Sequence, residues 1–220
     1  MAWEGGAVAV VTADQQASRR RQDLVPAALD LLSGCCAGVL LGFERTVGDE
    51  IQGVCTTAGT VVEVVLRLTR LGGWRVGIGI GSIERPLPSS TRQARGTAFL
   101  MARQAVETRR SPQGLRLLSA LTGEGRGSVS TASYGGLQDA ARYAESALIG
   151  LRALASRRTP EGWEVSEMAA NGASQAQIAE QLRVSRSAIS QRLAIANFDE
   201  VNRLAELTAL TLAAAMEADR

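Results

Sequence analysis

Three acidic residues stand at positions where short strands would bring them together. Asp14 follows the valine-rich run from Ala7 to Ala13, and Asp49 and Glu50 follow Gly48 between two short apolar runs. A Gly-Asp pair between such runs is typical of a β-hairpin turn. Carboxylates at neighbouring strand ends can hold Mg²⁺, which takes one or two carboxylates and completes its shell with water and phosphate oxygens.

Converging carboxylates repel one another and raise each other's pKa unless a cation lies among them. That cation is either a metal ion or an arginine of the run Arg19, Arg20 and Arg21. The alternative is an ordinary turn, in which Asp49 and Glu50 are simply solvated.

The composition of the 220-residue chain excludes several kinds of chemistry. All 24 basic residues are arginine, and there is no histidine, so neither a Ser-His-Asp triad nor a lysine Schiff base is available. Cys35, Cys36 and Cys55 make no disulfide framework and have no histidine to complete a zinc set, which predicts buried, reduced thiols. No apolar run approaches the roughly 20 residues that cross a membrane, and the N-terminus lacks the basic start of a signal peptide. We therefore expect a cytoplasmic protein with no membrane partner.

The pattern along the first hundred residues predicts an α+β domain that positions these acids. Its expected elements are a strand at 7–13, a helix from about Arg21 to Ser33, strands on either side of 47–49, a helix at 57–71 and a strand at 74–83. This βαββαβ order is that of the ferredoxin-like, or palm, arrangement, in which the end of the first strand lies beside the tip of the central hairpin. Glycines alternate with apolar residues from Trp74 to Ile83, which predicts that another segment approaches this strand closely.

The later part of the chain divides at a proline. A further helix and strand are expected between 96 and 121, and a long helix follows with Leu137, Ala141, Ala144, Leu148 and Leu151 on one face. Pro160 marks the start of a helical region. We therefore predict an α/β domain at 1–135, a connecting helix at 136–158 and an all-α domain at 159–220.

Four segments of the first domain form a pattern of their own. They read TADQQASRRR, GDEIQGV, WRVGIGIGSIE and GTAFLMARQAV, and they span about residues 7–110. Together they resemble the SatD family of bacterial proteins. The shared pattern is a strand-end acid followed by Ser-Arg, then Gly-Asp-Glu with Gln two residues later, a glycine-laced strand, and a helix with Ala-Arg. More distantly, the same segments resemble class III nucleotide cyclases and GGDEF diguanylate cyclases.

The resemblance implies a nucleotide site with Mg²⁺ as its cofactor. Asp14 and Asp49 would be the metal ligands, and Arg103 would neutralise a triphosphate. The other expected ligand-binding residues are Ser18, Arg19 and Glu50.

The chain also departs from the cyclase pattern in ways that argue against turnover. Phe99 stands where the cyclases carry an asparagine, and no lysine is present to read an adenine base. A site that binds a nucleotide or cyclic dinucleotide without converting it is therefore the expectation, and a metal-dependent nucleotidyl cyclase is the alternative.

A second motif lies in the helical region. The stretch SQAQIAEQLRVSRSAISQRL resembles the helix-turn-helix of sigma-factor region 4 and LuxR-type regulators, with Ser174 and Ser185 as N-caps. Arg183 stands where such turns usually carry glycine. The packing positions of two helices across a tight turn are Ile178, Ala179, Leu182, Val184, Ile189 and Leu193.

The resemblance implies that the second helix reads double-stranded DNA in the major groove. The expected DNA-binding residues are Arg183, Ser185, Arg186, Ser187, Ser190, Gln191 and Arg192. Arginine suits guanine, glutamine suits adenine, and serine suits either a base or a phosphate, whereas Arg183 and Arg192 are better placed for phosphates.

Charge distribution is the argument against DNA binding. The whole chain has a net charge of +2, but residues 159–220 hold five arginines against nine acids, a net of −4. A helical packing module of similar shape is the alternative. Residues 183–197 nevertheless contain arginine and no acid. We therefore predict a bacterial transcriptional regulator, and the stripe of Leu204, Leu207, Leu210 and Ala214 on the last helix predicts a homodimer.

Overall fold

The computed structural model of the chain describes residues 3, 5–18, 22–35, 37–108, 114–120 and 135–218, and of residues 135–138 only the backbone. Over these ranges the protein is α+β, with a mixed five-stranded sheet. The elements in chain order are β1 (Val8–Gln15), α1 (Val25–Ser33), β2 (Val39–Arg45), β3 (Glu50–Cys55), α2 (Ala58–Leu71), β4 (Trp74–Gly81), the short 3₁₀ helix η2 (Thr91–Gln93), α3 (Thr97–Glu107), β5 (Leu115–Ser119), α4 (Gly135–Ala155), α5 (Pro160–Ala170), α6 (Gln175–Leu182), α7 (Arg186–Ile195) and α8 (Phe198–Ala218). A search of these helices for one long and apolar enough to span a membrane finds none.

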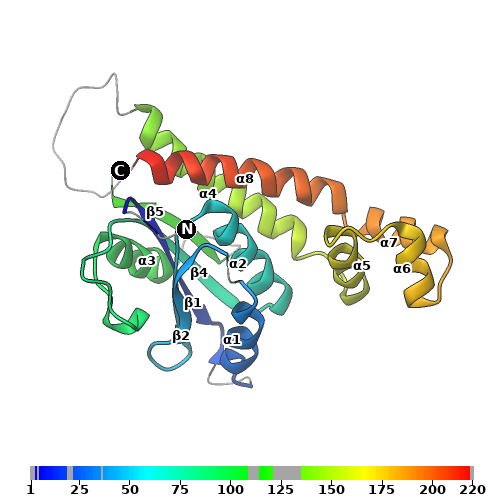
Figure 1. Cartoon of the computed structure of the whole chain (residues 1–220), viewed down its shortest axis with the longest axis horizontal. Helices are drawn as coiled ribbons and strands as arrows, with labels where there is room; N and C mark the ends of the chain where they lie inside the picture. The colour runs from blue at the N-terminus through cyan, green and yellow to red at the C-terminus, as the bar shows by residue number, and fades with distance from the viewer. Residues whose placement is uncertain are drawn as a thin grey trace.

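The sheet has the strand order β2-β3-β1-β4-β5 (Figure 1). β1 lies between β3 and β4 and is antiparallel to both, while β5 adds to the edge parallel to β4. β2 pairs antiparallel with β3. The register sets Asp14 opposite Glu50, so the end of β1 meets the tip of the hairpin between β2 and β3. The sequence predicts this meeting from the hairpin signal together with the order of the strands and helices.

Alternate residues of β1 face opposite sides of the sheet. Ala9 and Val11 belong to the main core, which α1, α2, α4 and α8 also build, whereas Val8 and Val10 pack with residues of α3. Figure 1 shows α3 apart from these four helices, across the sheet. Four helices therefore cover one face of the sheet, and α3 packs on the other.

Close approach of α3 explains the glycines of β4. A Cβ atom added at Gly79 would lie 2.1 Å from the carbonyl oxygen of Ala98 and 2.3 Å from the amide nitrogen of Ala102. Gly77 and Gly81 meet α3 in the same way. Because these strand positions carry no side chain, the backbone of α3 can rest directly on the strand. The alternation of glycine with apolar residues predicts this close approach.

Local signals set the ends of α1 and α2. α2 is helical despite its β-branched residues because its buried face is continuous from Val61 to Leu68 and Thr57 caps its start. The expected start of α1 near Arg21 is wrong: residues 22–24 are not helical, and the helix begins at Val25, with Pro26 in its first turn.

The side chain of Gln15 holds the segment before α1 against the end of β1. Its amide accepts from the backbone of Leu24 at 2.9 Å and donates to the carbonyl of Gln22 at 2.7 Å. Gln15 is also buried, so these two hydrogen bonds satisfy it inside the protein.

Helix α8 packs along α4 rather than staying with the short helices before it (Figure 1). Its buried residues include Val201, Leu212 and Met216, which belong to the same core as the sheet. The predicted leucine stripe lies largely on the opposite side, where Leu207 is 52% exposed and Leu210 is 70% exposed.

Helices α5, α6 and α7 form a small unit with a core of its own, made by Val165, Ile178, Ala179, Ile189 and Leu193. Both predicted N-caps are present. The Ser174 hydroxyl accepts from the amide of Gln177 in a capping box, and the Ser185 hydroxyl accepts from the amide of Ala188. The pattern of apolar residues therefore predicted this packing.

Candidate functional site

The end of β1 and the hairpin tip bring Asp14, Asp49 and Glu50 into one neighbourhood. Asp14 lies opposite Glu50 in the β1–β3 register, and the amide of Gln15 donates to the carbonyl of Asp49 at 3.2 Å. Burial, and then the negative charge of Asp49, raise the pKa of the Asp14 carboxyl, while the positive charge of Arg75 opposes the rise. The negative charges of the two aspartates therefore repel each other.

Among the described residues, the cation beside Asp14 is neither a residue of the arginine run 19–21 nor any other residue that the sequence suggested. Arg75, on the neighbouring strand β4, forms an ion pair with Asp14 at 3.4 Å. It faces Asp14 because the β1–β4 register sets the two residues opposite each other. Arg19 lies outside the described residues, and Ser18, three residues beyond the end of β1, is half-buried.

The third acid has a different partner. The Glu50 carboxylate accepts a hydrogen bond from the hydroxyl of Thr46, across the turn of the hairpin. In the described part of the chain, no three Asp, Glu, Cys or His residues are grouped so that they could hold a metal ion. A metal site at Asp14 and Asp49 stays a prediction.

A basic pocket of about 600 Å³ lies beside the hairpin, between β3, the segment that follows β4, and α3. Its lining includes Thr46, Gln52, Arg92, Arg95, Phe99 and Arg103. Gln52 donates to the hydroxyl of Thr12 at 2.7 Å, which fixes a polar floor on the α3 side of the sheet. The structure thus brings the predicted ligand residue Arg103 close to the hairpin.

The loop between β4 and α3 is tied to β2 through Glu44. Its carboxylate accepts from the Ser90 hydroxyl at 2.5 Å and from the backbone amide of Arg92 at 2.6 Å. Burial opposes ionisation of Glu44, but these hydrogen bonds outweigh it and lower the pKa of the carboxyl. The Thr91 hydroxyl donates to the carbonyl of Gly42 at 2.8 Å and adds a second tie. These bonds hold Arg92 and Arg95 at the mouth of the pocket.

Electrostatics make this pocket suited to an anion. Arg92, Arg95 and Arg103 line it with Glu84 as the one acid of the lining, and none of the three arginines forms an ion pair with a described acid. Guanidinium groups recognise phosphate and carboxylate through paired N–H donors. Arg92 and Arg95 were absent from the predicted site, although two arginines three residues apart in the loop after a glycine-laced strand were a usable signal.

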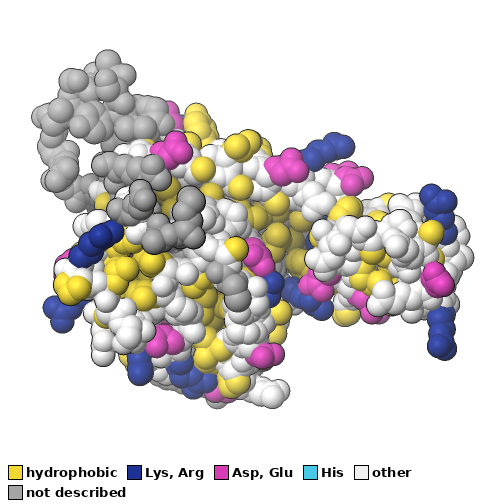
Figure 2. Space-filling model, in the orientation of Figure 1, with side chains coloured by type: hydrophobic (Ala, Val, Ile, Leu, Met, Phe, Trp, Pro, Cys, Tyr) yellow, Lys and Arg dark blue, Asp and Glu magenta, His cyan; other side chains and the backbone are white. Residues whose placement is uncertain are grey.

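The predicted DNA-binding residues gather on the exposed side of α7 and the turn before it. Ile189 and Leu193 are buried and hold the helix, whereas Arg186, Ser190 and Gln191 are exposed. Arg183, Ser185 and Ser187 are exposed as well, and Arg192 is half-buried. Figure 2 shows basic side chains at the outer end of this unit, away from the sheet.

Two details of the turn affect the charges it offers. Arg183 has φ +54° and ψ +43°, the left-handed conformation in which glycine is usual. Arg192 lies close enough to Glu161 of α5 to help lower the pKa of that carboxyl, after hydrogen bonds from the backbone amide of Glu161 and from Thr159. None of Arg183, Arg186 and Arg192 forms an ion pair with the acids that the structure describes.

Comparisons of the chain with known protein families, with curated proteins and with solved structures found no match.

Proposed function

We propose that the chain is a DNA-binding transcriptional regulator that reads DNA with α7. One observation carries the proposal: two buried side chains, Ile189 and Leu193, anchor α7, and its outer side presents polar groups without an acid. A helix that is fixed from behind and polar in front is what a major groove admits.

Within this proposal the exposed residues have different roles. Arg186 is in the first turn of α7, where a side chain reaches base edges, so it reads a guanine. Ser190 and Gln191 follow along the same exposed surface and contact neighbouring bases. Arg183, in the turn before the helix, contacts a phosphate.

Selection from a random duplex pool tests the proposal. Full-length protein should enrich a defined sequence motif over successive rounds, and the enriched duplex should bind more tightly than a scrambled duplex. Recovery of no motif, with equal affinity for all duplexes, contradicts sequence-specific DNA binding.

The sheet domain is proposed to be a SatD-like, ferredoxin-like palm that binds a phosphate-bearing ligand such as a nucleotide or a cyclic dinucleotide. Supporting this are the strand order, in which β1 runs antiparallel between β3 and β4, and the meeting of Asp14 with the hairpin. The basic pocket beside the hairpin falls within the range of about 300–1,000 Å³ that small-molecule sites have. Asp14 and Asp49, which repel each other, fit a divalent cation that would accompany the phosphates.

Phe99 favours binding over turnover in this pocket. It lies in the pocket lining, where its ring can stack on a base, and it occupies the position of the cyclase asparagine. The second candidate function is a metal-dependent nucleotidyl cyclase, which the Asp14–Asp49 pair and Arg103 favour. Incubation of the protein with nucleoside triphosphates and Mg²⁺ separates the two: intact triphosphate supports the sensor, and release of pyrophosphate supports the enzyme.

Helix α4 is the physical link between the two parts. Its buried Arg152 donates to the carbonyl of Trp74 and, at 3.1 Å, to that of Gly114, at the starts of β4 and β5. α4 ends at Ala155, five residues before α5 begins at Pro160. A change at the sheet can therefore reach the three-helix unit through one rigid element.

A homodimer completes the proposal. Leu207 and Leu210 are exposed on the outer side of α8, and a second copy packed there would cover them. Two copies of α7 could then meet half-sites about 34–36 Å apart on DNA. Light scattering of the full chain, compared with a variant in which both leucines are changed to glutamate, tests this assembly.

A further inference from the structure

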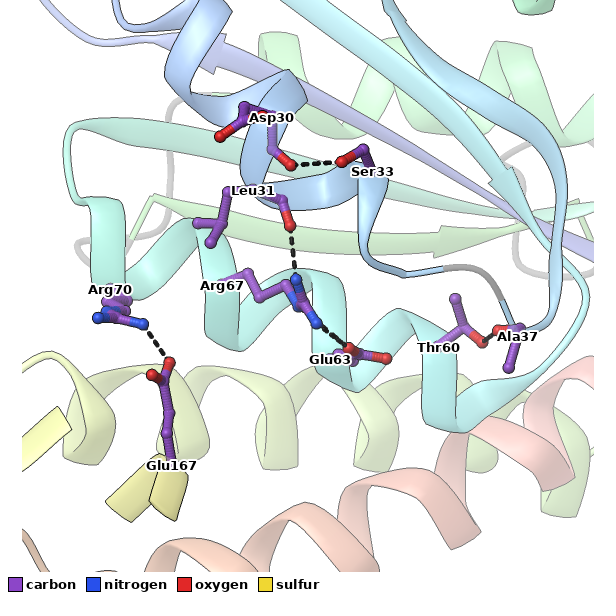
Figure 3. Close-up of polar contacts among 9 residues, drawn as sticks. All are labelled: Asp30, Leu31, Ser33, Ala37, Thr60, Glu63, Arg67, Arg70 and Glu167. Carbon is purple, nitrogen blue, oxygen red and sulfur yellow. Dashed lines mark hydrogen bonds and ion pairs between the residues drawn. The ribbon is translucent and has the colours of Figure 1, made fainter. Parts of the chain in front are cut away.

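A second cavity lies where the three-helix unit meets the sheet domain. This junction pocket has a volume of about 580 Å³ and is lined by residues of α2, α5 and the start of α8. Leu31 of α1 also contributes, and Figure 3 shows α2 running between α1 above and Glu167 of α5 below. A molecule in this pocket would contact both parts of the protein at once.

The charged groups of the junction pocket leave one guanidinium without a carboxylate. Glu63 pairs with Arg67, which donates two hydrogen bonds to its carboxylate, at 3.0 and 2.6 Å. Glu167 forms an ion pair with Arg70 (Figure 3). Arg67 also donates to the carbonyl of Leu31 at 2.5 Å. The remaining cation of the lining is Arg158. Three arginines and two glutamates give this lining a net charge of +1.

Two buried polar atoms in the lining have no hydrogen-bond partner among the described residues. One is the Nη2 nitrogen of Arg158, whose Nε donates to the carbonyl of Ala196 at 2.8 Å. The other is the hydroxyl of Ser166, a residue that is only 3% exposed. A buried donor or hydroxyl without a hydrogen-bond partner costs free energy of folding. Both groups therefore favour binding of a ligand that supplies a hydrogen-bond acceptor.

The rest of the lining is apolar and aromatic. Arg158 stacks on the ring of Trp163 at 4.9 Å, and Phe198, Val62 and Leu66 add hydrophobic surface. A binding site with an apolar wall and one unpaired cation recognises an apolar body that carries one negative charge.

We propose that the junction pocket binds a small apolar monocarboxylate, with its carboxylate on Arg158 and Ser166 and its apolar body against Trp163 and Phe198. The bound acid holds α5 against α2 and so sets the position of the three-helix unit. This site is separate from the basic pocket, which has three exposed arginines for a phosphate-bearing ligand and lies on the opposite face of the sheet.

Isothermal titration calorimetry on the full chain tests the proposal with indole-3-carboxylate, naphthalene-2-carboxylate and octanoate. At least one acid should bind with a Kd below about 1 mM, and its neutral carboxamide should bind about tenfold more weakly or not at all. No binding by any of the three acids overturns the proposal, as does equal binding of acid and amide.

Three variants locate the site. Ser166→Ala should weaken binding about three- to tenfold without lowering the melting temperature, because its hydroxyl has no partner to lose. Glu167→Gln should tighten binding about two- to fivefold, since it releases Arg70 from its ion pair. Arg45→Gln removes an exposed ion pair of the hairpin edge and should leave binding unchanged.

A fourth variant separates this site from the basic pocket. Arg103→Gln should not affect binding of the acid, whereas it should weaken binding of a nucleotide under the function proposed above. Loss of acid binding in Arg103→Gln, or no effect of Ser166→Ala, places the acid elsewhere and overturns the proposal, whatever the outcome for nucleotide binding.

Discussion

Replacement of Arg183 by glycine should stabilise the protein and weaken its binding to DNA. Arg183 holds a left-handed backbone with φ +54°, a conformation that costs a residue with a Cβ atom about 1–2 kcal/mol. Glycine relieves this strain but adds about 0.5–1 kcal/mol of unfolded-state entropy. Its amide still donates to the carbonyl of Glu180, and the turn keeps the bond from Val184 to Ala179. The expected net gain is about 0.5–1 kcal/mol, or roughly 1–4 °C in melting temperature for a chain of this size.

Thermal unfolding by circular dichroism measures this gain. Arg203→Gly is the matched control, since Arg203 is exposed and lies inside the regular helix α8, beyond its first turn. There the same substitution should cost about 1 kcal/mol. The loss of a phosphate contact at Arg183 should lower the salt dependence of DNA binding by about 0.9 in the log-log slope. A lower melting temperature for Arg183→Gly refutes the strain argument, and an unchanged slope refutes the phosphate contact.

Three further predictions follow from packing and from pKa values. Gly79→Ala should destabilise the protein by about 1–3 kcal/mol in urea unfolding, because its Cβ would overlap the α3 backbone. Gly42→Ala is the matched control, since its added Cβ would have nothing within 4 Å. Equal stability of the two variants contradicts the packing of α3 on the sheet. Burial, with smaller contributions from Cys35 and Glu63, raises the pKa of the Cys55 thiol to about 12, so peptide mapping after iodoacetamide treatment of native protein at pH 8 should find Cys55 unlabelled. Because the pKa of Asp14 is raised above its ordinary 3.8, ionisation of Asp14 opposes folding. The contribution of Asp14 to stability should be largest below that value and fall as the pH rises through the raised pKa. Asp14→Asn should remove this fall in pH-dependent urea unfolding, and Asp49→Asn should reduce it; identical pH profiles for all three proteins contradict the argument.

Local patterns predicted most of the elements. The Gly-Asp turn, the glycine-laced β4 and the two serine caps each have a physical reason that acts within a few residues, and the structure has all of them. The predicted start of α1 was wrong because Gln15, from a different element, binds the backbone of Gln22 and Leu24 and holds the residues before that helix against the end of β1. Such a contact leaves no trace in the periodicity of the helix itself.

Partners from non-adjacent segments were the harder part of the site. Asp14 was expected to need a cation, but Arg75 lies opposite it only because β4 joins β1 on the side away from the hairpin. The junction pocket depends on α5 lying across the pocket from α2, about a hundred residues earlier in the chain, where Arg70 pairs with Glu167. A single sequence carries no signal for that contact.

Affinity for DNA, measured by fluorescence anisotropy with the selected duplex and a scrambled duplex of equal length, tests the central claim most directly. Arg186→Ala should weaken binding to the selected duplex by about 1–3 kcal/mol and leave binding to the scrambled duplex nearly unchanged. Arg203→Ala, on α8 and outside the proposed set of DNA-binding residues, should affect neither. If Arg186→Ala weakens both duplexes equally, Arg186 contacts only phosphate; if it changes neither, α7 is not the recognition element and the proposed function is wrong.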